Sequence, residues 1–179
     1  MSELKQLSSK VVYKNRWMSV REDKVQRPSG LEGIFGVVDK PDFVVIIPYQ
    51  DGYVHLVEQY RYPVEKRFWE FPQGSWELET DKRPEEIAIG ELKEETGLTS
   101  SNMKYVGHQY LAYGYSSQGY HIFLATDLTQ NETELESEEE DLITSKFSIE
   151  EFEKMLTDGT IKDATTLCAY SLAKMKGVL

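Results

Sequence analysis

Three glutamates that lie close together in the sequence offer the clearest chemistry of the chain: Glu91, Glu94 and Glu95. The segment around them carries signals for both ends of a helix, because Pro84 suits the first helical position and Gly97 suits a residue that stops a helix. A helix over about 84 to 96 would place residues three and four positions apart on one face. The spacing therefore predicts that three carboxylates crowd together on that face.

Such a cluster of like charges has two interpretations. A divalent cation such as Mg2+ or Mn2+ would relieve the repulsion, since both ions bind hard oxygen ligands, usually carboxylates completed by water and substrate phosphates. Alternatively, the helix exposes an acidic face to solvent, which is common in a protein with 31 acidic and 20 basic residues. The spacing alone leaves both interpretations open.

The segment 71–98 resembles the Nudix hydrolase signature, G-x5-E-x7-R-E-U-x-E-E-x-G-U, in which U is aliphatic; it reads FPQGSWELETDKRPEEIAIGELKEETGL. The match is nearly complete at the C-terminal end, which contains the three glutamates. Gly74 lies two residues further from Glu91 than the signature asks. Lys82 and Gly90 occupy the positions of a Glu and an Arg that commonly pair in the family. The resemblance therefore implies that the metal-binding positions are intact. It also implies that this chain lacks the Glu–Arg pair that braces the helix in the family.

Flanking segments extend the resemblance to most of the chain. They are YKNRW at 13–17, QYR at 59–61, EFPQG at 70–74 and GTIKDA at 159–164. These look like segments of the ADP-ribose pyrophosphatase branch of Nudix enzymes, which hydrolyses nucleoside diphosphate sugars. Members of that branch are typically homodimers whose N-terminal strands reach the partner subunit. The resemblance therefore implies a homodimeric hydrolase of a nucleoside diphosphate sugar.

Apolar runs and turn signals predict strands for most of the chain and helices at its end. The expected strands are 10–13, 18–26, 34–38, 43–48, 53–60, 69–72, 104–112, 121–127 and 142–147, and the expected later helices are 149–157 and 164–176. This order predicts the α/β class, and the resemblance narrows it to the Nudix fold, with mixed β-sheets sandwiched between helices (α/β/α). We expect an N-terminal β-hairpin or meander within residues 1–42, contributing to the dimer, and one catalytic domain over 43–179.

Three residues outside the helix are candidates for binding substrate. Arg61 follows an expected strand and could place its guanidinium on a diphosphate, the role that the family resemblance favours, or it could be a surface arginine paired with an acidic residue. Trp17 could stack on a nucleobase or lie in the core. Glu70 precedes the FPQG turn and could bind a metal or pair with an arginine, or it could be an exposed strand carboxylate.

Two loops add further candidates. Seven of the ten residues from 132 to 141 are acidic, a composition typical of a solvated charge run. In the resembled branch a Glu of this loop often activates water, and Glu139 or Glu140 is best placed, with Glu136 or Glu138 as alternatives. In the loop 113–119, YGYSSQG departs from the Pro-Gly pair and acidic residues of many ADP-ribose enzymes. We expect Tyr113 or Tyr115 to line the sugar or base pocket.

Composition excludes several classes of partner. The net charge of -11 at pH 7 argues against a nucleic-acid partner, because no Lys/Arg cluster offsets it. No stretch approaches the ~20 apolar residues that a membrane span needs. The one cysteine, Cys168, excludes an internal disulfide framework and lies in an apolar helical pattern. We therefore expect a cytoplasmic protein without a nucleic-acid or membrane partner.

The resulting prediction is Mg2+- or Mn2+-dependent hydrolysis of the pyrophosphate bond of a nucleoside diphosphate sugar such as ADP-ribose, giving a nucleoside monophosphate and a sugar phosphate. The expected metal ligands are Glu91, Glu94, Glu95 and the Gln73 carbonyl, and Glu95 also counts as catalytic. Three alternatives remain: a Nudix hydrolase of dinucleoside polyphosphates or nucleoside triphosphates, a catalytically weak nucleotide-sugar-binding module, and a structural acidic interaction domain.

Overall fold

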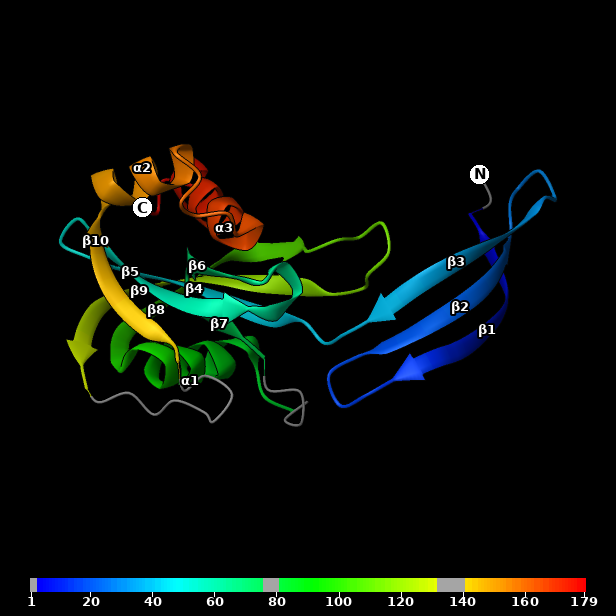
Figure 1. The fold of residues 1–179 in the computed structure, drawn as a ribbon, viewed down its shortest axis with the longest axis horizontal. Coiled ribbons are helices and arrows are strands. Elements are labelled where there is room, and N and C mark those ends of the chain that lie inside the picture. The colour runs from blue at the N-terminus through cyan, green and yellow to red at the C-terminus, as the bar shows by residue number, and fades with distance from the viewer. Residues whose placement is uncertain (1–2, 76–80, 132–140) are drawn as a thin grey trace. The chain divides into compact units, whose positions relative to one another are not determined.

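A computed structural model describes residues 3–75, 81–131 and 141–179 (Figure 1). The chain divides into two compact units. One comprises Met1–Asp42 and Gln109–Tyr120, and the other comprises Phe43–His108 and His121–Leu179. The sequence-based division into residues 1–42 and 43–179 stays a prediction, and the structure adds the segment 109–120 to the first unit.

The first unit is built on a three-stranded antiparallel sheet in the order β1-β2-β3. Its strands are β1 (Lys5–Lys14), β2 (Ser19–Gln26) and β3 (Glu32–Asp39). Gly30, with φ at 86°, turns the chain between β2 and β3, a conformation that glycine adopts without steric cost. The segment 109–120 joins β3 where the Val38 amide donates to the Tyr115 carbonyl at 2.8 Å. The expected N-terminal antiparallel strands are confirmed.

The second unit contains a larger sheet that carries most of the core. Its central path runs β10-β5-β4-β9-β8, with β6 paired to β5 and β7 paired to β4. The strands are β4 (Phe43–Gln50), β5 (Tyr53–Arg61), β6 (Lys66–Glu70), β7 (Gln73–Gly74), β8 (Leu98–Tyr110), β9 (Gly119–Gln130) and β10 (Ile143–Ser148), and a short 3-10 helix, η1 (Tyr62–Val64), links β5 to β6. β4 lies centrally because its side chains are buried on both faces.

Helices cover both faces of this sheet (Figure 1). On one face α1 (Pro84–Thr96) buries Ala88 and Leu92 against Val44 and Ile46 of β4. On the other face lie α2 (Ile149–Thr157) and α3 (Ala164–Met175). The ring of Phe152 packs there between those of Phe71 and Tyr170, at centroid distances of 5.2 and 4.9 Å. The predicted α/β/α arrangement is confirmed.

The helix ends agree closely with the sequence signals. Pro84 begins α1, and Gly97 ends it with φ at 69°. Ser148 caps α2 through a hydrogen bond from the Glu151 amide, and Asp163 caps α3 by accepting from the amides of the first turn. α3 ends at Met175, one residue before the predicted end.

Most strands differ from their predicted bounds, and β7 was not predicted. β1 begins at Lys5 rather than 10, and β9 ends at Gln130 rather than 127. β8 begins at Leu98 rather than 104, because its polar start is stabilised by side-chain hydrogen bonds to the neighbouring strand, including Ser100 Oγ to the Thr126 carbonyl at 2.6 Å. β6 ends at Glu70 rather than 72, because its pairing with β5 stops where Glu70 meets Val57. In the part of the chain that the structure describes, no helix is long and apolar enough to cross a membrane.

Candidate active site

The three glutamates of α1 lie on the helix that the sequence predicts. Glu95 is fully buried and Glu91 is 6% exposed, whereas Glu94 is half-buried. A charged side chain is rarely buried unless it is paired, hydrogen-bonded or bound to a metal. The burial of Glu91 and Glu95 therefore contradicts a simple solvated acidic face, since α1 directs these two carboxylates into the protein.

The backbone of β7 lies directly against these carboxylates. The Gln73 amide donates to Glu95 Oε2 at 3.0 Å. A Cβ atom placed on Gly74 would lie only 2.3 Å from Glu91 Oε2, so a larger residue here would displace this carboxylate. β7 itself is held in place by β4, where Gln73 pairs with Val45 and Gly74 with Val44.

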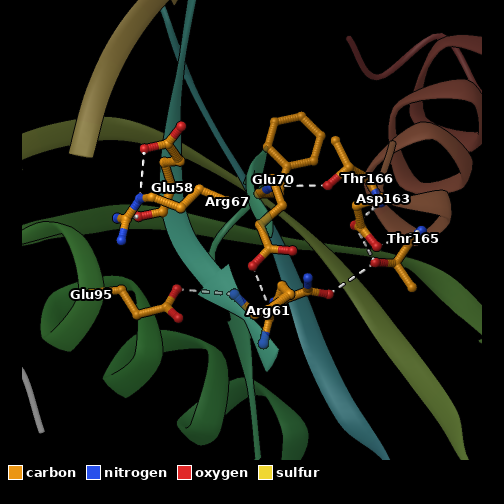
Figure 2. Close-up of polar contacts among 10 residues, drawn as sticks. Glu58, Arg61, Arg67, Glu70, Glu95, Asp163, Thr165 and Thr166 are labelled. Carbon is orange, nitrogen blue, oxygen red and sulfur yellow. Dashed lines mark hydrogen bonds and ion pairs between the residues drawn. The ribbon is translucent and has the colours of Figure 1, made fainter. Parts of the chain in front are cut away.

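Arg61 and Glu70 form an ion pair near the same segment (Figure 2). The Glu70 side chain is only 3% exposed, whereas that of Arg61 is 39% exposed. Burial raises the pKa of Glu70 to about 7, although Arg61 acts in the opposite direction. Glu70 is thus not the exposed strand carboxylate considered as one alternative. The pair presents the accessible guanidinium of Arg61, held by a buried partner.

The N-terminus of α3 supplies residues that the sequence analysis did not single out. Thr166 Oγ1 accepts a hydrogen bond from the Phe71 amide at 2.9 Å. Thr165 Oγ1 lies 2.9 Å from Gln73 Oε1 and also contacts Asp163 Oδ2. The GTIKDA segment that ends at residue 164 pointed to this region as part of the family resemblance, but no sequence pattern indicates that its helix contacts residues 71–74.

The three aromatic candidates belong to the other unit. Trp17, Tyr113 and Tyr115 have exposed fractions of 42%, 84% and 62%. Trp17 is thus not a core residue, and its ring is covered by the guanidinium of Arg16 at 4.1 Å from the ring centroid. Their contact with substrate stays a prediction, as do the roles of the other candidates.

The candidate bases Glu139 and Glu140, with the alternatives Glu136 and Glu138, lie outside the described residues. Asp141, at the end of the acidic run, pairs with Arg67 of β6. Arg67 also binds Glu58 of β5 at 3.0 Å (Figure 2). The last residue of the acidic run is therefore paired with the β5–β6 hairpin.

The donor set on α1 fits a divalent cation. Carboxylate and carbonyl oxygens are the ligands that Mg2+ and Mn2+ prefer. Two of the three carboxylates are buried beside a glycine whose missing side chain leaves space for one of them. An arginine with an exposed guanidinium lies on the adjoining β5 strand, at the end of the β5–β6 pairing. The arrangement can hold a cation and an anionic substrate together.

Two family models match consecutive parts of the chain. A model described as the nucleoside diphosphate sugar hydrolase N-terminal domain matches residues 4–38. The NUDIX domain model matches residues 39–170, which is well over half of the chain.

Similar proteins agree with these matches. An ADP-ribose pyrophosphatase of Bacillus subtilis (strain 168) is 27% identical over 99% of this chain and 96% of its own length. A methanol dehydrogenase activator of Bacillus methanolicus is 25% identical over the same shares, 99% and 96%. An ADP-ribose pyrophosphatase of Mycobacterium tuberculosis (strain ATCC 25618 / H37Rv) is 28% identical over 90% of this chain and 78% of its own length.

A solved structure shares the fold. The crystal structure of an ADP compounds hydrolase superposes with a TM-score of 0.87 at 22% identity, over 98% of this chain and 94% of that one. At this identity the likeness supports the fold alone, whereas the NUDIX model supports the family. The chain belongs to the NUDIX family and is a pyrophosphohydrolase.

Proposed function

We propose that this enzyme hydrolyses the pyrophosphate bond of nucleoside diphosphate sugars of the ADP-ribose type, giving a nucleoside monophosphate and a sugar phosphate. The observation that carries the proposal is the burial of Glu91 and Glu95 against the backbone of β7. The match to the N-terminal domain of nucleoside diphosphate sugar hydrolases and the two ADP-ribose pyrophosphatase relatives support this class of substrate.

Glu91, Glu94 and Glu95, with the Gln73 carbonyl, would hold Mg2+ or Mn2+. When bound, such an ion neutralises phosphate charge and lowers the pKa of water. The protein itself holds the carboxylate oxygens close together in a site that is largely shielded from solvent. The Gln73 amide helps to orient Glu95 by donating a hydrogen bond to it. NUDIX hydrolases generally need a divalent metal, and we propose Mg2+ as the ion that this enzyme uses.

Arg61 would bind the diphosphate. A guanidinium has five N–H donors, so it can contact Glu70 and phosphate oxygens at once. Glu70 then acts as the partner that orients Arg61, since the carboxyl is buried and the guanidinium is accessible. Trp17 and Tyr113 or Tyr115 would bind the base or the sugar, as their exposed rings allow.

A glutamate of the acidic run, Glu139 or Glu140, would deprotonate or orient the attacking water. General bases typically contribute ~10^2 to 10^4-fold to the rate. Replacing each with Gln should therefore lower kcat with little effect on KM, whereas Arg61→Ala should raise KM more than it lowers kcat. Unchanged kcat in every single Gln variant from Glu132 through Glu140 would remove the glutamates of the acidic run from the mechanism.

The deciding experiment compares product release from ADP-ribose, other nucleotide sugars, a dinucleoside polyphosphate and a nucleoside triphosphate, each with Mg2+ and with EDTA. Metal-dependent turnover fastest on a nucleotide sugar supports the proposal. Fastest turnover of a polyphosphate or triphosphate selects another NUDIX substrate class. Tight binding of ADP-ribose without turnover of any substrate selects the binding module. Absence of both binding and turnover selects the interaction domain.

The proposal includes two predictions about the protein in the cell. We infer a homodimer formed through the N-terminal strands and a cytoplasmic location. The first is supported by the exposure of every residue of β1, apolar ones included. The second is supported by the single cysteine, Cys168, which has no partner for an internal disulfide.

A further inference from the structure

The segment from Phe71 to Gly74, here called the 71–74 segment, lies between α1 and α3. It contacts Glu95 of α1 through the Gln73 amide and Thr165 and Thr166 of α3 through Gln73 and Phe71, and Figure 2 shows Glu95 on the opposite side of the view from the two threonines. These two helices cover opposite faces of the sheet. The segment is therefore the place where a change on one face can reach the other.

On the side of α1, the segment touches both buried carboxylates. The Gln73 amide donates to Glu95 Oε2 at 3.0 Å, and Gly74 borders the carboxylate of Glu91. The position of the segment thus decides where the oxygens of Glu91 and Glu95 can lie.

On the side of α3, the segment is held by two hydroxyl groups. Thr166 Oγ1 accepts from the Phe71 amide at 2.9 Å, and Thr165 Oγ1 lies 2.9 Å from Gln73 Oε1. Both threonines are buried, with exposed fractions of 0% and 3%. A lost hydrogen bond here would not be replaced easily by water, because the site is closed to solvent.

Asp163 contacts the Thr165 hydroxyl and the Thr166 backbone in turn. Its Oδ2 accepts from the Thr166 amide at 2.7 Å and contacts the Thr165 hydroxyl. The cap of α3 and the contacts to the 71–74 segment therefore involve the same three residues, Asp163, Thr165 and Thr166.

The sheet alone constrains the segment weakly. β7 pairs with β4 only at Gln73 and Gly74, and the Ile46 amide donates to the Pro72 carbonyl at 2.9 Å. Pro72 has no amide proton to donate. The threonine contacts consequently supply a substantial share of the polar contacts that hold the segment in place.

We propose that Thr165 and Thr166 are positioning residues: by holding the 71–74 segment from the α3 side, they set the Glu91 and Glu95 carboxylates at the spacing that binds the cation. This inference rests on the proposed function, since it assigns the cation to these carboxylates. On this inference α3, on the opposite face of the sheet from α1, influences the cation site through the 71–74 segment. The threonines themselves do not contact the cation.

The test measures Mn2+ binding without substrate, by the loss of the free-ion signal in electron paramagnetic resonance. The variants are Thr166→Val and Thr165→Val, which keep the side-chain size and remove the hydroxyl, and Thr166→Ser, which restores it. Thr157→Val is the matched control, because the Thr157 hydroxyl bonds only the Lys154 carbonyl of its own helix, α2. Thermal unfolding of every variant in EDTA measures stability separately.

We expect each Val variant at 165 and 166 to raise the Kd for Mn2+ about five-fold, the equivalent of one hydrogen bond. Thr166→Ser and Thr157→Val should stay within about two-fold of the wild type, well below that loss. Should Thr166→Val fail to fold, Thr165→Val decides. Wild-type Mn2+ affinity in the Val variants, even with a lowered Tm, overturns the positioning role. A wild-type protein that binds no Mn2+ overturns the proposed cation site and this inference together, which distinguishes the two failures.

Discussion

The buried acidic residues of this protein differ in how they are stabilised. Glu95 accepts from a backbone amide, and Glu70 pairs with Arg61. Sequence alone predicts that Glu91, Glu94 and Glu95 share a helix face, because the helical period fixes that geometry. It cannot predict that Gly74 borders Glu91 or that Thr166 contacts Phe71, because these contacts depend on tertiary packing between residues far apart in the chain.

Removal of one charge from the three glutamates of α1 should impair metal binding without lowering the free energy of unfolding. Glu95→Gln keeps an oxygen that can accept from the Gln73 amide but removes a ligand charge. We expect kcat/KM with Mg2+ to fall at least about 100-fold. Losing a residue that only orients a metal ligand already costs about 10- to 100-fold, and Glu95 would be a ligand itself. Urea unfolding in EDTA should show a fold at least as stable, because like charges in one helix repel.

Glu85→Gln is the matched control for that change, since Glu85 lies exposed in the first turn of the same helix. It should leave kcat/KM unchanged. Full activity of both Glu95→Gln and the corresponding Glu94→Gln variant would contradict the metal-site assignment.

Glu70 predicts a defined pH dependence of stability. Its pKa is about 7 in the folded protein against a usual value of 4.5, so between these values the folded state holds more protons than the unfolded state. The contribution of Glu70 to the free energy of unfolding is fully present below pH 4.5. It falls by about 3 kcal/mol as the pH rises through 7. Urea unfolding in EDTA at pH 5 and pH 8 should show that the loss is smaller in Glu70→Gln. Equal pH dependence in both proteins would contradict the raised pKa.

At the scale of elements, sequence signals predict helices better than strand ends. The bounds of α1 follow from Pro84 and Gly97, which act locally. The start of β8 is polar, and its strand conformation depends on hydrogen bonds to Thr126 on the neighbouring strand. Local patterns do not report such partners, which is why the predicted strand began at 104.

Helix α1 lacks the bracing pair of the family signature, and this predicts a coupling between two positions. Lys82 is exposed before the helix and Gly90 is half-buried within it. Gly90→Arg alone should not raise activity, because Lys82 has the same charge. The double variant Lys82→Glu with Gly90→Arg should be more stable than the sum of the two single changes predicts. The excess, which is the coupling energy, should be a few tenths of a kcal/mol. A double-mutant cycle of urea unfolding measures the coupling, and a zero or unfavourable value would show that the longer loop separates the two positions.

At the scale of the whole molecule, the family resemblance contributed what patterns could not. Element order supports the α/β class, whereas the resemblance supplied the Nudix fold, which the NUDIX match confirms. Neither predicted that residues 109–120 would join the N-terminal strands in one unit. The contacts that make this association include the bridge between Val38 and Ser116 and a hydrogen bond from Ser117 to Asp39, which have no sequence signal.

The predicted homodimer can be tested on β1, whose residues are all exposed within the subunit. Val11 is 55% exposed despite its apolar side chain. Val11→Glu should weaken the dimer and shift sedimentation towards the monomer, because burying a carboxylate at an interface is costly. Ser101→Glu introduces the same charge on β8 and should leave the dimer intact. A wild-type protein that sediments as a monomer at every concentration would contradict the prediction.

The close approach of Gly74 to Glu91 has a genetic consequence. The φ of Gly74 lies outside the left-handed region, so glycine is needed there for space and not for backbone conformation. Gly74→Ala should lower kcat/KM at least about ten-fold by displacing the Glu91 carboxylate from the cation. Glu91→Asp retracts that carboxylate by one methylene, and is therefore the expected second-site suppressor of Gly74→Ala: each change alone impairs the enzyme, and the double variant recovers activity above Gly74→Ala. A screen for restored activity that never selects a shorter side chain at 91 would contradict this pairing.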